Sequence, residues 1–262
     1  MQRDKIVVAC NWKAYLGIAE SISLARALSE YAGKAELKQR VIVAPSHAAL
    51  YQVGRQLEGT QVELCAQNVN VEANGPFTGA LSLEAMKEIG CKNAILGHSE
   101  VRSGKSLGIA ETDQLISDKF RMCINANINP ILCIGETSKE RDSGLALDVL
   151  RRQMLTGLDA MRGTNAKAGN VLIAYEPVWA ISSNGPSRIP DPREINETVA
   201  KLKKLLFSEF GAPAARCVKF LYGGSVDCSN VSGYTGQSSI DGVLIGGMST
   251  NKAKIIEMLG KL

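Results

Sequence analysis

The stretch that decides the fold is VLIAYEPVWAISSNG, from Val171 to Gly185. Its first four residues, Val171 to Ala174, are all apolar, which fits a strand buried on both faces, as strands of parallel sheets are. Pro177 has no N–H and ends the strand. The sequence therefore places the carboxylate of Glu176 at the carboxyl end of a buried strand. A lone carboxylate there more often caps a helix or pairs with a lysine, so other stretches must decide its role.

Short apolar runs recur along the chain and alternate with segments of helical periodicity. The runs lie at residues 5–9, 41–44, 62–66, 93–97, 130–134, 171–175, 218–222 and 241–245. The helical segments lie at residues 21–31, 48–57, 82–89, 145–161, 194–210 and 251–262. Alternation of this kind in 262 residues predicts an α/β fold, a single-domain (β/α)₈ TIM barrel over residues 1–262. An open doubly wound sheet is the alternative.

Composition excludes some classes of protein. No run of 18 apolar residues occurs, and no charged start is followed by an apolar stretch, so we expect no membrane span, no signal peptide and a cytoplasmic protein. The formal net charge is only +4, and the lysines Lys201, Lys203 and Lys204 lie on a helix opposite leucines. This pattern is typical of a solvated helix face, so we expect no nucleic-acid partner.

The seven cysteines are odd in number, mostly embedded in apolar runs, and form no Cys-x-x-Cys pair. They read as reduced core residues and not as a disulfide framework or a zinc site. We also expect no metal and no cofactor.

Polar residues follow the apolar runs, at the edge where barrels collect their reactive groups. They are Asn11 and Lys13 after the first run, His98, Ser99 and Glu100 after the fourth, Glu176 after the sixth, Gly223, Gly224 and Ser225 after the seventh, and Gly246 and Gly247 after the eighth. Each alone has a simpler explanation as a turn, a surface residue or a helix cap. Together they supply a base, an imidazole, a cation, an amide and backbone N–H groups that can hold a phosphate.

Motifs along essentially the whole chain carry a resemblance to one family. They are Asn11-Trp12-Lys13, Ala66 to Val69, Phe77-Thr78-Gly79, Gly97-His98-Ser99-Glu100, Cys133 to Glu136, Ala174 to Ala180, Tyr222 to Ser225, and Asp241 to Gly247. In this order and at these strand ends they resemble the triosephosphate isomerases. The resemblance implies interconversion of dihydroxyacetone phosphate and D-glyceraldehyde 3-phosphate in glycolysis and gluconeogenesis.

The resemblance also implies roles for individual residues. In this family a glutamate moves a proton between two carbons through an enediolate, and a neutral histidine polarises the carbonyl. The resemblance gives these two roles to Glu176 and His98. A helix beginning at Ser99 could supply the N–H group that bonds the second imidazole nitrogen. The remaining implied residues are Lys13 and Asn11 at the oxyanion, Glu100 beside Lys13, Ser99, Cys133 and Tyr222 in support, and Ser182, Ser225, Gly246 and Gly247 at the phosphate.

The loop from Gln67 to Gly79 resembles the family loop that enters a neighbouring subunit. We therefore expect a homodimer in which Gln67, Thr78 and Gly79 belong to the contact loop and Thr78 lies close to the partner's active site. A long surface loop is the alternative.

Two departures from the family pattern bear on substrate choice. Ser182 to Gly185 replaces a Gly-Thr-Gly-Lys lid and is followed by what resembles a short insertion, Ser187 to Pro190, while Met248 stands where alanine is common. Two alternatives therefore remain, a paralogous isomerase of a four-carbon sugar phosphate and a catalytically silent relative that binds a phosphorylated ligand.

Overall fold

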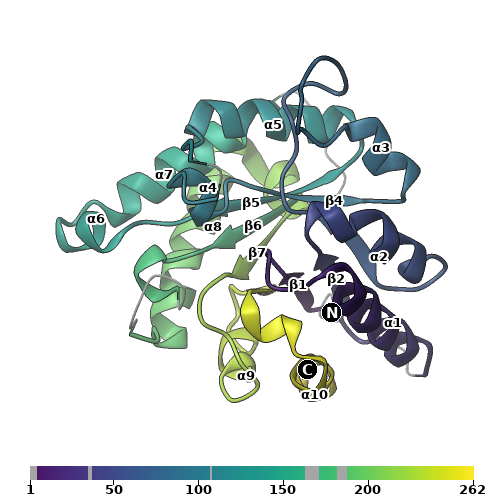
Figure 1. Ribbon diagram of the computed structural model, residues 1–262. Coiled ribbons are helices and arrows are strands. Elements are labelled where there is room, and N and C mark those ends of the chain that lie inside the picture. The colour runs from purple at the N-terminus through teal and green to yellow at the C-terminus, as the bar shows by residue number, and fades with distance from the viewer. Residues whose placement is uncertain (1–4, 35–36, 107, 163–170, 182–187) are drawn as a thin grey trace.

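The computed structural model describes residues 5–34, 37–106, 108–162, 171–181 and 188–262. Parallel strands close into one barrel in chain order, and helices surround it (Figure 1). The strands are β1 Val7–Asn11, β2 Arg40–Ala44, β3 Glu63–Ala66, β4 Asn93–Leu96, β5 Asn129–Ile134, β6 Val171–Tyr175, β7 Val218–Tyr222 and β8 Gly242–Ile245. The predicted single-domain (β/α)₈ barrel is confirmed, and the open sheet is wrong because β1 pairs with β8.

Helices cover the outside of the barrel in the part of the chain described. They are α1 Ile18–Lys34, α2 Leu50–Leu57, α3 Leu83–Glu88, α4 Ser99–Arg102, α5 Asp113–Asn125, α6 Ser138–Asp142, α7 Ala146–Gly157, α8 Pro192–Cys217, α9 Val231–Thr235 and α10 Lys252–Lys261. Short 3₁₀ helices lie at His47–Ala49, Asp159–Met161, Val178–Ala180 and Gly247–Thr250. Among the described residues, no helix combines the length and the apolar character needed to cross a bilayer. The barrel is shown for the described residues. The domain boundaries at residues 1 and 262 stay a prediction.

The strands are buried on both faces, as their apolar composition predicts. In β6, Leu172 and Ala174 belong to the cluster inside the barrel, whereas Val171, Ile173 and Tyr175 belong to the larger cluster between the strands and helices. Alternate side chains point to opposite faces of a strand, so both sets are withdrawn from water. The barrel is therefore a packed core that holds the strand ends in fixed positions.

Some boundaries differ from the sequence-based prediction. The first strand is Val7–Asn11 and not residues 5–9, because it pairs with β2 from Val7 opposite Arg40 to Asn11 opposite Ala44. Asn11 is therefore the last residue of the strand. The segments predicted at 48–57 and 145–161 each divide into an α-helix and a 3₁₀ turn.

Helix α5 was not predicted, although its pattern is visible in the sequence. The side chain of Thr112 caps its start by accepting from the N–H of Leu115, and Ile116, Phe120 and Cys123 form its buried face. Helix α8 is longer than the predicted 194–210, and Gly211, with φ of 78°, interrupts its helical conformation. The differences in α5 and α8 lie outside the strand ends that form the site.

Candidate active site

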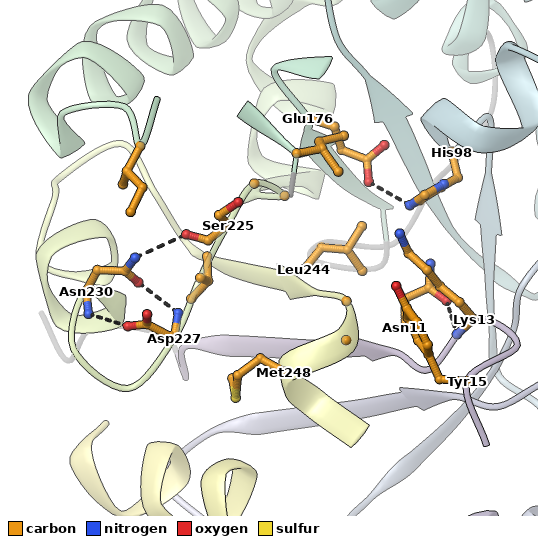
Figure 2. Close-up of a pocket in the computed structure, with 17 residues that line it drawn as sticks. Asn11, Lys13, Tyr15, His98, Glu176, Ser225, Asp227, Asn230, Leu244 and Met248 are labelled. Carbon is orange, nitrogen blue, oxygen red and sulfur yellow. Dashed lines mark hydrogen bonds and ion pairs between the residues drawn. The ribbon is translucent and has the colours of Figure 1, made fainter. Parts of the chain in front are cut away.

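A cavity of about 180 Å³ lies at the carboxyl ends of the strands (Figure 2). Seven predicted residues line it, namely Asn11, Lys13, His98, Glu176, Ser225, Gly246 and Gly247. Residues to which the sequence analysis gave no role also line it, namely Tyr15, Ile181, Ile189, Val226, Asp227, Asn230 and Leu244. Most of these are apolar or lie in loops, where neither chemistry nor periodicity distinguishes a pocket wall from a core or surface residue.

Glu176 follows β6 directly and is 2 % exposed. Its Oε2 accepts a hydrogen bond from the backbone N–H of Ser99 at 3.1 Å, and its Oε1 lies 3.3 Å from Nε2 of His98. A methyl group on Gly223 would lie 2.7 Å from Cγ of Glu176, so only glycine leaves room for this side chain. The carboxylate is therefore held out of bulk water beside the imidazole.

His98 caps the start of α4, as expected for a helix beginning at Ser99. Its Nδ1 accepts a hydrogen bond from the N–H of Glu100 at 3.2 Å. Because a nitrogen that accepts cannot carry the proton, this contact assigns the proton of the neutral ring to Nε2. Nε2 faces Glu176 and can donate to a ligand oxygen in the cavity.

Lys13 has the unusual backbone φ of 49°, and hydrogen bonds from three directions hold it. Its Nζ pairs with Oε1 of Glu100 at 2.8 Å, its N–H donates to Oδ1 of Asn11 at 3.0 Å, and its carbonyl accepts from Nε2 of Gln67 at 2.8 Å. Burial raises the pKa of Glu100, but the hydrogen bond and charge of Lys13 outweigh it, so the net pKa is below its ordinary value. The ammonium thus keeps a charged partner at the edge of the cavity.

Ser225 lines the part of the cavity where Figure 2 also shows Asn230, and Gly246 and Gly247 line the cavity directly after β8. The hydroxyl of Ser225 donates to the carbonyl of Ala180 at 2.9 Å, which ties the end of β7 to the segment that follows Glu176. Gly246 lies next to Lys13, since a methyl group there would be 3.8 Å from Nζ. Ser182, the fourth predicted phosphate contact, lies outside the described residues.

Cys133 and Tyr222 are both fully buried below the site. Burial, and then the negative charge of Glu176, raise the pKa of the Cys133 thiol well above its ordinary value, so it stays protonated. Burial likewise raises the pKa of Tyr222, and its ring stacks on Tyr234 with 4.1 Å between the centroids. Both residues pack around the site, and neither lines the cavity.

Glu136 is a buried carboxylate that the sequence analysis left without a role. It is fully buried, and its Oε1 accepts from Nε1 of Trp179 at 2.8 Å, from the hydroxyl of Tyr175 at 3.1 Å and from Arg141 at 3.3 Å. Trp179 is thereby anchored three residues after Glu176. A glutamate two residues after the fifth strand was a visible signal, since buried carboxylates need such donors.

The contact loop divides into two parts. Gln67 contacts its own chain, because its Nε2 donates both to Lys13 and to the carbonyl of Ala44 at the end of β2. Thr78 and Gly79 are exposed at the far end of the loop and do not line the cavity of their own chain. Their predicted contact with a partner subunit stays a prediction.

The site has the parts needed to remove a proton from a carbon next to a carbonyl. The carboxylate of Glu176, the imidazole N–H of His98 and the ammonium group of Lys13 surround one small cavity. The imidazole N–H and the ammonium group can face a developing oxyanion. Within the described ranges, no group of three or more histidine, cysteine, aspartate and glutamate side chains is placed to hold a metal ion.

Comparison with known proteins identifies the family. The family model described as "Triosephosphate isomerase" matches residues 6–262. Proteins named triosephosphate isomerase from Prosthecochloris aestuarii and Symbiobacterium thermophilum are 36% and 39% identical to this chain. The first match covers 98% of this chain and 97% of that protein, and the second covers 93% and 91%. A relative of the same name from Roseiflexus castenholzii is 37% identical over 93% of this chain and 92% of its own. The chain belongs to the triosephosphate isomerase family.

Proposed function

We propose that this protein interconverts dihydroxyacetone phosphate and D-glyceraldehyde 3-phosphate. The observation that carries the proposal is the convergence of Glu176, His98 and Lys13 on one cavity, in a chain whose relatives are named triosephosphate isomerase. The cavity, at about 180 Å³, is smaller than the roughly 300–1,000 Å³ of sites for drug-sized ligands. This size favours a substrate of a few carbons.

In the proposed reaction the carboxylate of Glu176 takes a proton from the carbon next to the carbonyl. The electron pair of the broken C–H bond forms an enediolate, and Glu176 returns the proton to the neighbouring carbon. Nε2 of His98 gives its proton to the former carbonyl oxygen and then takes the hydroxyl proton from the neighbouring oxygen, so that the carbonyl and the hydroxyl group exchange places. Lys13, with Asn11 beside it, balances the negative charge of the enediolate.

The base alone is not sufficient for an enzyme. A positioned base contributes about 10²–10⁴-fold, whereas enzymes typically accelerate their reactions by about 10⁶-fold or more. The remainder comes from the fixed charge of Lys13, the N–H of His98 and exclusion of water from a small cavity. The burial of Glu176 supports the exclusion of water, and the ion pair with Glu100 supports a fixed position for the charge of Lys13.

The phosphate of the substrate binds backbone N–H groups of Ser225, Gly246, Gly247 and Ser182 in this proposal. The support is that the first three line the same cavity as the catalytic groups. Backbone N–H groups at the ends of strands and the starts of helices are common anion sites.

A steady-state assay with D-glyceraldehyde 3-phosphate, with detection of dihydroxyacetone phosphate, tests the function. We expect kcat/KM of about 10⁶–10⁸ M⁻¹s⁻¹ and a fall in kcat of about 10²–10⁴-fold in Glu176→Gln. Glu257→Gln, the same chemical change at an exposed helix position outside the cavity, is the matched control and should match the wild type.

The same assay separates the two alternatives. Faster turnover of a four-carbon sugar phosphate would favour the paralogous isomerase, for which the presence of Met248 in the cavity wall is the specific argument. Absence of turnover with either substrate would favour the silent relative.

We also propose a cytoplasmic homodimer. Phe77, beside Thr78 in the contact loop, is 40% exposed, and Tyr15, which lines the cavity, is 57% exposed. Large apolar side chains at these two places suit a contact in which the loop of one subunit covers the site of the other. The described residues include all seven cysteines and hold no disulfide, and six of the cysteines are buried, which fits a reducing compartment.

A further inference from the structure

Ile189 is an apolar residue of the cavity wall to which neither the sequence nor the proposed reaction gives a role. It lines the same cavity as Glu176, His98 and Lys13, yet 58% of its surface is exposed. It also belongs to the segment that resembles an insertion relative to the family pattern. An exposed isoleucine in the wall of a small cavity gains burial when a ligand fills the cavity beside it.

The residue before Ile189 is held by two interactions. Nη2 of Arg188 donates to Oε2 of Glu194 at 2.6 Å, and its guanidinium carbon lies 5.7 Å from the ring centroid of Trp179. Glu194 also pairs with Arg141, whose guanidinium carbon lies 4.4 Å from the centroid of the same ring. One carboxylate therefore joins Arg188 to the cluster that anchors Trp179.

The residue after Ile189 is held from the other side. The carbonyl of Pro190 accepts a hydrogen bond from the hydroxyl of Tyr234 at 2.7 Å, and the ring of Tyr234 is fully buried against Tyr222. Asp191 then caps α8 by accepting from the N–H of Arg193 at 2.8 Å. Contacts on both neighbours thus restrict where the side chain of Ile189 can lie.

The hydrogen bond between Pro190 and Tyr234 also indicates which end of the cavity the neighbouring Ile189 occupies. Tyr234 lies in α9, and Asn230, which precedes α9, lines the cavity. In Figure 2, Asn230 and Asp227 lie at the opposite end of the cavity from His98 and Lys13. Ile189 is therefore part of the wall at the end remote from the catalytic groups.

We propose that Ile189 is a specificity-determining residue that sets the length of the phosphate ester the site accepts, and that Arg188 and Tyr234 are its positioning residues. This inference rests on the proposed function. With the reacting carbons fixed between Glu176 and His98, a longer ester extends toward the remote wall. Ile189 then excludes esters longer than a triose phosphate because there is no space for the additional carbon.

The test is Ile189→Ala, with kcat/KM measured for D-glyceraldehyde 3-phosphate and for the one-carbon-longer D-erythrose 4-phosphate. We expect the ratio of the two values to shift toward the longer substrate by about tenfold or more, since one methylene in a fitted pocket is worth about 10–200-fold. The loss with the triose phosphate should appear mainly in KM. Leu147→Ala removes the same number of carbons from an exposed position outside the cavity and should leave the ratio unchanged.

The positioning residues have their own variants. Tyr234→Phe keeps the stacked ring and removes only the hydroxyl, and Arg188→Ala removes the pair with Glu194. Both should shift the ratio in the same direction by a smaller factor, and Arg188→Lys, which keeps the charge, should restore most of it. Wild-type ratios in both Tyr234→Phe and Arg188→Ala would overturn the positioning roles.

Two results would overturn the main inference and are distinguishable. If the wild type isomerises the triose phosphate and Ile189→Ala leaves the ratio unchanged, the inference is wrong and the proposed function stands. If the wild type turns over no triose phosphate, the proposed function is wrong and the inference fails with it.

Discussion

The position of the Glu176 carboxylate depends on two glycines that contact it. A methyl group on Gly135 would lie 1.8 Å from the carbonyl oxygen of Glu176, and one on Gly223 would lie 2.7 Å from its Cγ. The first glycine allows the backbone of Glu176 to approach β5, and the second leaves space for its side chain. Two glycines that the sequence alone suggests are turn residues therefore determine the position of the catalytic carboxylate.

Gly223→Ala tests this dependence. The added methyl group displaces the carboxylate, and a misplacement of about 1 Å can lower the rate of an enzyme by about 10²-fold, so we expect kcat to fall by about 10–10²-fold with a smaller change in KM. Gly33→Ala in α1, where a methyl group meets nothing within 4 Å, is the control. Equal kcat in the wild type and Gly223→Ala would show that the base tolerates this displacement.

The charge on Glu100 gives a prediction about pH. Its pKa is lowered in the folded protein by Lys13, so its contribution to stability is present above the ordinary pKa of 4.5 and is lost as pH falls through the lower folded value. Glu100→Gln removes this contribution. Urea unfolding should therefore show a difference between wild type and variant that is constant from neutral pH to 4.5 and shrinks below it. A difference that does not change with pH would contradict the pairing of Glu100 with Lys13.

At the scale of elements, Gln67 connects the ends of three strands. It follows β3 by one residue, and its amide donates to the carbonyl of Lys13 beyond β1 and to that of Ala44, the last residue of β2. Lys13 keeps its left-handed φ of 49° in this arrangement. Such conformations cost about 1–3 kcal/mol and persist only where neighbouring contacts hold them.

Gln67→Met keeps the length of the side chain and removes both donors. Because two carbonyl oxygens lose a partner, we expect the free energy of unfolding to fall by about 1–3 kcal/mol and kcat to fall as Lys13 loses its fixed position. Chemical denaturation and steady-state kinetics measure the two effects. Gln61→Met makes the same change at an exposed position and should alter neither.

At the scale of the whole molecule, the proposed dimer makes Phe77 and Phe207 respond differently to the same substitution. Phe77 is 40% exposed in the contact loop, and Phe207 is 57% exposed on α8. Phe77→Asp places a charge in the proposed interface and should give a species with the mass of one chain, whereas Phe207→Asp should keep the mass of two. Sedimentation equilibrium distinguishes them. A wild-type protein with the mass of one chain would contradict the dimer.

Much of the barrel could be predicted because its signals are local. Four successive apolar residues before Glu176 identify a buried strand in any parallel sheet. Boundaries were less certain where pairing decides them, since only the register with β2 shows that Asn11 ends the first strand. Helix α5 was missed although its capping threonine and apolar spacing are both present in the sequence.

The sequence alone determined the alternation of strands and helices, the family resemblance, and the position of Glu176, His98 and Lys13 at strand ends. Only the tertiary structure decided which nitrogen of His98 accepts from Glu100, why Gly135 and Gly223 must be glycine, and that Ile189 reaches the cavity. Residue types and their periodicity are properties of a segment and can be read from it. Gly135 and Gly223 contact Glu176 only once the barrel closes, because closure brings the ends of different strands together. Which nitrogen of His98 faces the N–H of Glu100 depends on the backbone conformation and rotamer at the start of α4.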